Sequence, residues 1–151
     1  MRPAMNNKLF TNAIEQLEKR KALVEDLRGI PYANLKNIKD VEKYLNRHFD
    51  KIGELSVDIK ASQSIGNWIY LDIDFPKSQS YRWRKLQRKE VEDWIWDMYT
   101  AILTLYNEDG LLHGAVRNPY YSRYSNSNFK NYVTFDTKDK DLYFDFYKSQ
   151  L

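Results

Sequence analysis

Apolar and polar residues alternate strictly in two stretches near the middle of the chain, residues 56–60 and 68–75. Neighbouring side chains of a strand point to opposite faces, so this period of two predicts two strands with one buried face each. Gly66 and Asn67 lie between the stretches and adopt a positive φ readily, which predicts a hairpin. Its expected core face carries Val57, Ile59, Ile69, Leu71, Ile73 and Phe75, and its other face carries Ser56, Asp58, Lys60, Tyr70, Asp72 and Asp74.

An amphipathic helix is expected within residues 1–29. Apolar residues recur there at spacings of three, four and seven, and Gly29 and Pro31 are typical of a helix end. Such a helix either packs on its own domain or pairs with a second copy, so a homodimer through this helix is one expectation. Its apolar residues, from Phe10 to Leu27, are Phe10, Ile14, Leu17, Val24 and Leu27.

A second helix is expected just before the hairpin. Asn37 is a suitable N-cap, and Asp40 in the first turn interacts favourably with the helix dipole. Gly53 is expected to end the helix, and His48 lies beside the apolar stripe, which favours a boundary position over a ligand. The stripe consists of Ile38, Val41, Leu45, Phe49 and Ile52.

A third helix is expected after the hairpin, beginning at Ser78 or Ser80 and ending within residues 107–110. Its apolar stripe is expected to cover the core face of the hairpin. The helical period is lost from Leu111 onward. The stripe consists of Val91, Trp94, Ile95, Met98, Ile102 and Leu105.

Two further alternating strands, residues 132–137 and 142–147, close the chain. The resulting order α-α-β-β-α-β-β predicts a single α+β domain over residues 1–151, an antiparallel four-stranded sheet with helices on one face. In the closing strands we expect Val133, Phe135, Leu142, Phe144 and Phe146 on the core face, and Tyr132, Thr134, Asp136, Tyr143, Asp145 and Tyr147 on the other.

The composition excludes several kinds of site. The chain has no cysteine and only two histidines, which excludes disulfides, thiolate metal sites and histidine-rich metal sites. It contains no apolar run of membrane-spanning length and no charged-then-apolar leader, so we expect a cytoplasmic protein of a host cell with no membrane contact. Phosphate-binding loops, dinucleotide fingerprints and nucleophile elbows are also missing. We therefore expect no enzymatic activity, no cofactor and no bound metal.

A basic and aromatic segment follows Pro76. It contains six basic residues and no acidic one, over residues 77–89. Cations neutralise phosphates and aromatic rings stack on bases, so this composition is typical of surfaces that bind single-stranded nucleic acid. The alternative is a solvated helix start, balanced by acidic residues one turn later. The candidate binding residues are Lys77, Tyr81, Arg82, Trp83, Arg84, Lys85, Arg88 and Lys89.

A second candidate surface lies in residues 119–131, where tyrosine and arginine occur among serine and asparagine without an acidic residue. This composition is typical of adaptable protein-binding surfaces. The alternative is an ordinary long loop whose rings fold back onto the core. The candidate binding residues are Tyr120, Tyr121, Arg123, Tyr124 and Lys130.

Carboxylates collect on the predicted outer face of the sheet. Palm-type enzymes hold two magnesium ions on such a face, and residues 69–74 resemble the apolar-Asp-apolar-Asp strand of primase-like palms. No glycine-rich turn follows that strand, and only His113 offers itself as a partner histidine, which favours a solvated or partner-facing sheet. The set comprises Asp58, Asp72, Asp74, Asp136 and Asp145, interleaved with Tyr70, Tyr143 and Tyr147.

Three segments, residues 41–45, 55–62 and 69–73, resemble the small α-β-β domains attached to large polyvalent proteins of phages and mobile elements. The second also resembles a strand-turn-strand of small phage inhibitors of type II CRISPR systems, which ends in an Ile-Lys-Ala-Ser type segment. The resemblance transfers no site residue. It implies a small binding protein, and inhibitors of that kind occlude a nucleic-acid channel, bridge two enzyme copies or contact the guide RNA.

These observations favour a phage or mobile-element anti-defence inhibitor that binds a host nucleoprotein or its nucleic-acid channel. One alternative is a stand-alone protein that binds single-stranded RNA or DNA. Another is a palm-like, metal-dependent phosphoryl-transfer enzyme that uses the carboxylate-bearing sheet face. A structural or assembly protein that dimerises through the first helix is a fourth.

Overall fold

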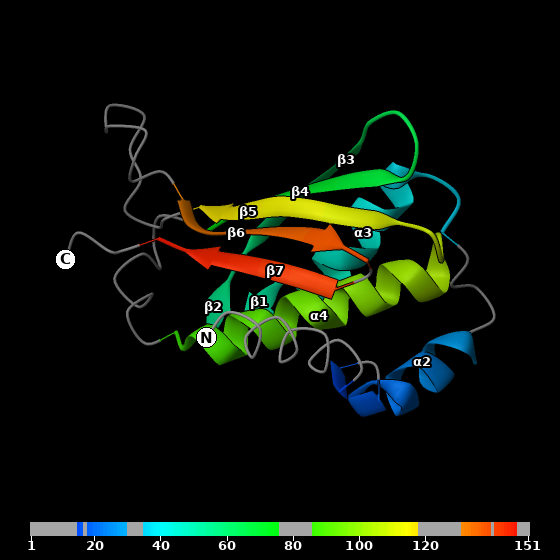
Figure 1. The fold of residues 1–151 in the computed structure, drawn as a ribbon, viewed down its shortest axis with the longest axis horizontal. Coiled ribbons are helices and arrows are strands. Elements are labelled where there is room, and N and C mark those ends of the chain that lie inside the picture. The colour runs from blue at the N-terminus through cyan, green and yellow to red at the C-terminus, as the bar shows by residue number, and fades with distance from the viewer. Residues whose placement is uncertain are drawn as a thin grey trace.

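The structure, a computed structural model, describes residues 15–16, 18–29, 35–75, 86–117, 131–139 and 141–147. It is an α+β fold in which helices pack against one face of a five-stranded sheet (Figure 1). In spatial order the strands are β3 (Asp58–Gln63), β4 (Trp68–Asp74), β5 (Leu111–Arg117), β6 (Asn131–Lys138) and β7 (Asp141–Phe146). The described helices are α2 (Lys21–Arg28), α3 (Ile38–His48) and α4 (Arg88–Leu105), and a separate two-stranded sheet joins β1 (Lys51–Ile52) to β2 (Leu55–Ser56).

The α+β class was predicted correctly, but the four-stranded antiparallel sheet was wrong. β4 and β5 run parallel, with α4 as the connection between them, and the other neighbours in the large sheet are antiparallel. The strand that the pattern missed is β5. Its sequence, Leu-Leu-His-Gly-Ala-Val-Arg, shows no clean alternation because apolar residues, Leu111 and Ala115, also occupy outward positions, and a glycine in its interior weakens the strand signal.

Three helix boundaries also differ from prediction, and one is the end of α4, which lies at Leu105 and not within residues 107–110. α3 ends at His48, so Ile52 lies in β1, and Gly53, with φ 61°, makes the turn to β2. α4 begins at Arg88 and not at Ser78 or Ser80, since Gln87 is extended. Its start lies just before Glu90, a carboxylate in the first turn, where the helix dipole favours negative charge.

The predicted cap of α3 is confirmed, because Asn37 Oδ1 accepts a hydrogen bond of 2.9 Å from the Asp40 backbone N–H. The predicted end of the first helix at Gly29 is confirmed as well. Phe10, Ile14 and Leu17 lie outside the described side chains.

α4 is the centre of the core. The sheet covers one side of it, and α2 packs on the side away from the sheet, where Leu27 contacts Ala101 and Leu105 (Figure 1). The buried Arg20 fixes this packing, because its Nε donates to Asp97 Oδ1 at 2.6 Å and its Nη2 donates to the Asp93 backbone oxygen at 3.1 Å. The described part of the first helix therefore docks on its own chain. The buried residues of α4 are Val91, Trp94, Ile95, Trp96, Met98, Tyr99, Thr100, Ala101, Ile102 and Leu105.

Side chains of α3 form hydrogen bonds with backbone groups on the outer edge of β3. Asn46 Nδ2 donates to the Ile59 backbone oxygen at 2.7 Å, and Asn46 Oδ1 accepts from the Ile59 N–H at 2.9 Å. Glu42 Oε1 accepts from the Ala61 N–H at 2.8 Å. These bonds replace the strand that β3 lacks on this side, so the edge is closed to a further chain.

Asn46→Ala is expected to lower the free energy of unfolding by about 1–3 kcal/mol, because both backbone groups of Ile59 lose their partner in a partly buried place. Lys43→Ala, at an exposed position of the same helix, serves as the control and should stay within about 0.5 kcal/mol. Urea denaturation of both variants measures the difference. Equal stability of the two variants would contradict the role given to Asn46.

Gly114→Ala is expected to lower the free energy of unfolding by about 3 kcal/mol or more. A Cβ there would collide with the Leu71 carbonyl oxygen, a backbone atom that cannot rotate away, and would lie 2.8 Å from Phe135 Cζ. Gly29→Ala is the matched control, because Gly29 has helical φ and an added Cβ would make only ordinary contacts of 3.5 Å. It should be neutral or slightly stabilising in the same thermal and urea unfolding measurements.

Candidate functional site: the open sheet face and the loop edge

The face of the large sheet that α3 and α4 leave uncovered, here called the open face, carries aligned rows of side chains. Direct cross-strand partners stand side by side, so the pairing register fixes each row. One row is Ser62, Tyr70, His113, Asp136 and Tyr143, and the next is Lys60, Asp72, Ala115, Thr134 and Asp145; at the strand ends Asp58 pairs with Asp74, and Arg117 pairs with Asn131. The prediction that the five carboxylates share one face with tyrosines is confirmed.

Tyr132 is the exception to the predicted faces. Val116 pairs with Val133 and Arg117 pairs with Asn131, so Tyr132 is an extra residue in β6 and forms a bulge. Its side chain is only 8% exposed and packs edge-on against Phe146, with ring centroids 5.5 Å apart. The predicted outward position of Tyr132 was wrong because an alternating sequence pattern contains no signal for a bulge.

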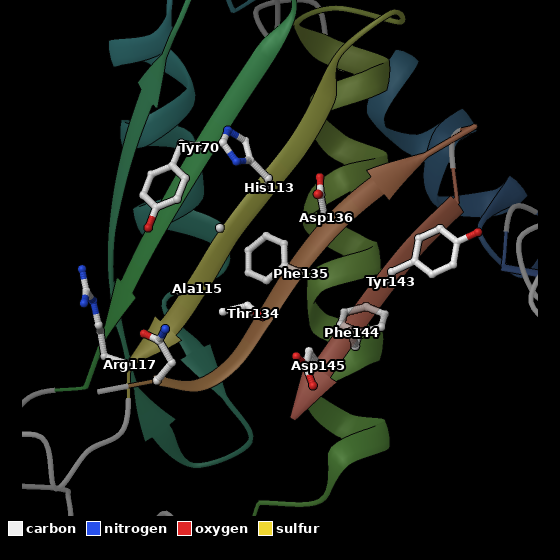
Figure 2. A pocket seen from close by; sticks show the side chains of 12 residues that line it. Tyr70, His113, Ala115, Arg117, Thr134, Phe135, Asp136, Tyr143, Phe144 and Asp145 are labelled. Carbon is white, nitrogen blue, oxygen red and sulfur yellow. The ribbon is translucent and has the colours of Figure 1, made fainter. Parts of the chain in front are cut away.

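A hollow of about 420 Å³ lies on the open face over β5, β6 and β7. Its floor includes Ala115 and Thr134, a directly paired couple whose small side chains leave space between larger neighbours. Figure 2 shows Tyr70 and His113 on one side of this space and Tyr143 on the other. The His113 imidazole stands edge-on to the rings of Trp68 and Tyr70, at centroid distances of 5.0 and 5.1 Å.

One carboxylate of the open face is neutralised within the chain. Arg117 donates two hydrogen bonds to Asp72, from Nε to Oδ1 at 2.8 Å and from Nη2 to Oδ2 at 3.1 Å. Both side chains are largely shielded from water, with 19% and 25% of their surfaces exposed. The bonds to Asp72 raise the pKa of Arg117, so this guanidinium stays charged over the ordinary pH range.

The rows nevertheless hold five carboxylates against two cations, Lys60 and Arg117. Burial raises the pKa of Asp74, and the negative charges of Asp72 and Asp58 raise it further, against the opposing effect of the two cations. Burial and the same Asp72 charge also raise the pKa of Tyr70. The open face is therefore a region of negative potential.

The residues that the structure describes contain no group of three histidine or carboxylate side chains that could hold a metal ion. Asp72, which the palm-like interpretation would assign to a metal, is held by Arg117 instead. Two further neighbours in the rows, Ala115 and Thr134, offer no carboxylate.

Sequence reasoning missed Ala115 and Arg117 as parts of a site and considered His113 only as an isolated histidine, because it missed the strand that carries all three. The sequence does contain a signal for this strand, because two of the four alternate positions from Leu111 to Arg117 are polar, His113 and Arg117. Leu111 and Ala115 concealed that signal, since apolar residues on the outward positions hide an alternating pattern.

Only two members of the predicted basic segment belong to the described residues. Arg88 begins α4, and its Cζ lies 4.9 Å from the centroid of the Phe146 ring, a cation–π contact. Lys89 Nζ lies 3.8 Å from Asp93 Oδ2. The others, Lys77, Tyr81, Arg82, Trp83, Arg84 and Lys85, lie outside the described residues, as do Tyr120, Tyr121, Arg123, Tyr124 and Lys130 of the second surface.

The described residues that flank these two segments lie at one edge of the sheet, here called the loop edge. β4 and β5 are parallel neighbours, so their last residues, Asp74 and Arg117, end on the same side. Asn131 begins β6 opposite Arg117, and Arg88 begins α4 against the last residue of β7. Residues 76–85 and 118–130 thus leave and rejoin the described structure at the same end of the molecule (Figure 1).

Asp74→Asn is expected to stabilise the fold at pH 7 by about 0.2–1 kcal/mol, because Asp74 directly faces Asp58 across β3 and β4. A raised pKa means that ionisation of Asp74 is disfavoured in the folded state, so the gain should be full above the folded pKa and vanish below the unfolded value. Chemical denaturation at pH 7 and near pH 3 measures both limits. Asp109→Asn, in an exposed turn, is the control, and an equal gain at both pH values would contradict the assignment.

No protein-family model, curated protein sequence or solved structure matches this chain. None of the described helices combines the length and apolar character that a membrane crossing requires. The function is therefore argued from the geometry and the sequence.

Proposed function

We propose that this chain is a phage or mobile-element anti-defence protein that binds a host nucleoprotein through its loop edge. The observation that carries the proposal is the parallel pairing of β4 and β5, which brings the flanks of both acid-free segments to one place. The phage assignment rests on the resemblance of residues 41–45, 55–62 and 69–73 to small phage and mobile-element proteins. Action by binding alone, without catalysis, agrees with that resemblance.

The distribution of charge supports a partner that contains nucleic acid. Residues 76–89 and 118–130 hold eight of the 24 basic residues and none of the 21 acidic ones. The rest of the chain then has 16 basic against 21 acidic residues. A basic end attracts phosphates, while an acidic remainder is repelled by them, so the net charge of +3 conceals a strongly polarised molecule.

The nature of the two segments also fits single-stranded RNA or DNA. Tyrosine and tryptophan lie among the cations, and stacking on aromatic rings contributes about 1–3 kcal/mol per base. A nucleoprotein offers such bases on its guide RNA or on a displaced strand. Free nucleic acid offers them too, which is why a stand-alone nucleic-acid-binding protein is the second candidate.

Binding to a short single-stranded RNA should be weakened strongly by a variant in which Arg82, Arg84, Lys85 and Arg88 are all replaced by alanine. For the unchanged protein, the logarithm of the affinity should fall with the logarithm of salt concentration with a slope of about −4 if six phosphates are contacted. Electrophoretic mobility shifts over a salt series measure both quantities. The matched control loses the same charge at exposed positions nearer the other end of α4, by alanine replacement of Arg28, Lys36, Lys39 and Lys43.

The same proteins separate the two candidates when they are added to target-DNA cleavage by a purified type II CRISPR effector with its guide. Inhibition by the unchanged protein and the control, but not by the loop-edge variant, is the result expected of an anti-defence protein. RNA binding without inhibition would favour the stand-alone protein. If all three proteins bind RNA and inhibit cleavage to the same extent, the loop edge is not the binding surface.

A further inference from the structure

The two borders of the large sheet differ. β3 ends the sheet on one side, where Asn46 and Glu42 of α3 bond its outer backbone groups. β7 ends the sheet on the other side (Figure 1). Within the described residues, no helix or strand forms backbone hydrogen bonds with the outer side of β7. An edge strand of this kind is a template for a further strand.

The bonds between β7 and β6 show which backbone groups of β7 point outward. The Tyr147 N–H donates to the Tyr132 backbone oxygen, on β6, at 2.9 Å. In an antiparallel pair, residues with inward and outward backbone groups alternate along the strand, so Phe146 and Phe144 direct their N–H and C=O groups away from β6. These groups have no hydrogen-bond partner among the described residues, and a second strand would supply one.

The start of this edge is protected by the chain itself. Leu142 also directs its backbone groups outward, and its N–H donates to the Oδ1 atom of the buried Asp141 at 2.9 Å. That carboxylate occupies the first donor of the edge. It leaves the Leu142 carbonyl oxygen and the groups of Phe144 and Phe146 for another chain.

The side chains of β7 are complementary to a second copy of β7. Two copies of one strand pair antiparallel about a twofold axis, so one residue stands beside itself. With Phe144 on that axis, Leu142 of each copy stands opposite Phe146 of the other, and Tyr143 stands opposite Asp145. The first set forms an apolar row on the core face, and the second pairs hydroxyl groups with carboxylates on the open face.

The carboxylates of β7 select this register over its neighbours. With Tyr143 on the axis, Asp141 of one copy would stand opposite Asp145 of the other. With Asp145 on the axis, the two copies of Asp145 would stand opposite each other. Like charges directly opposite one another destabilise a strand pair, and larger shifts shorten the paired stretch of β7. The register with Phe144 on the axis avoids both penalties.

We propose that β7 pairs antiparallel with β7 of a second copy of this chain, and that the two sheets join into one across a twofold axis at Phe144. The outward groups of Phe144 then bond those of its copy, and each Phe146 N–H bonds the Leu142 oxygen of the other chain. Because the two strands run in opposite directions, the loop edges of the two copies lie at opposite ends of the joined sheet. The dimer needs no nucleic acid and no other protein, so the inference does not depend on the proposed function.

Sedimentation velocity of the unchanged full chain over a dilution series tests whether the dimer forms. Pairing of two short strands buries less surface than a standard protein interface, so we expect a reversible dimer whose fraction falls on dilution. A monomer at every concentration up to the solubility limit would overturn the inference.

Charge substitutions at Tyr143 test the register in the same measurement. Tyr143→Glu places a carboxylate opposite Asp145 of the other copy at two symmetric positions and should weaken the dimer about tenfold. Tyr143→Lys places an ammonium group there and should dimerise at least as tightly as the unchanged protein. Tyr143 is 39% exposed, so both variants should fold. The matched controls, Ser62→Glu and Ser62→Lys, make similar changes at an exposed position of β3 and should leave the equilibrium unchanged.

Two substitutions at Phe144 test the backbone bonds. Phe144→Pro removes the N–H on the axis, and an edge strand accepts proline where that N–H faces outward. Phe144→Ala loses the same ring but keeps the N–H. The proline variant should therefore be monomeric at concentrations at which the alanine variant still dimerises.

A dimer that is unaffected by Tyr143→Glu would place the contact on another surface, such as the first helix, and would overturn the inference. The same holds if Tyr143→Glu and Tyr143→Lys weaken the dimer equally, because the register predicts opposite effects for the two charges. The Tyr143 variants decide the matter even if Phe144→Pro fails to fold.

Discussion

β4 and β5 run side by side in the same direction, and this contact determines where the other elements lie. Parallel neighbours cannot be joined by a tight turn, so the chain has to cross the sheet between them, and α4 makes that crossing. The helix then becomes the layer on which both the sheet and α2 pack. Gly114 permits the contact, because its missing side chain leaves room for the Leu71 backbone and the Phe135 ring.

The same contact separates two surfaces of opposite charge. The carboxyl ends of β4 and β5 meet at the loop edge, where the flanks of the basic segments lie, whereas the open face carries five carboxylates, of which Asp58 and Asp74 lie at its border with the loop edge. Arg117 lies at the boundary. It ends β5 at the loop edge, but its guanidinium turns back to Asp72, so its charge stabilises the open face and is not available to a partner.

Much of the fold could be predicted from local patterns. The hairpin, the cap at Asn37 and the faces of β6 and β7 follow from alternation and capping, which depend on neighbours in the sequence. β5 and the bulge at Tyr132 could not be predicted in this way. A central strand is defined by the strands that pair with both of its edges, and a bulge is defined by the register with another strand, so both depend on contacts between residues far apart in the chain.

The candidate hollow illustrates the same limit. Asp136, Asp145 and Tyr143 were recognised on one face, but alternation alone gave no reason for a concavity among them. The concavity arises because Ala115 of the missed strand stands directly beside Thr134, so two small side chains meet between two rows of larger ones. Once that register is known, the hollow follows from the side-chain sizes in adjacent rows, which no single strand's pattern contains.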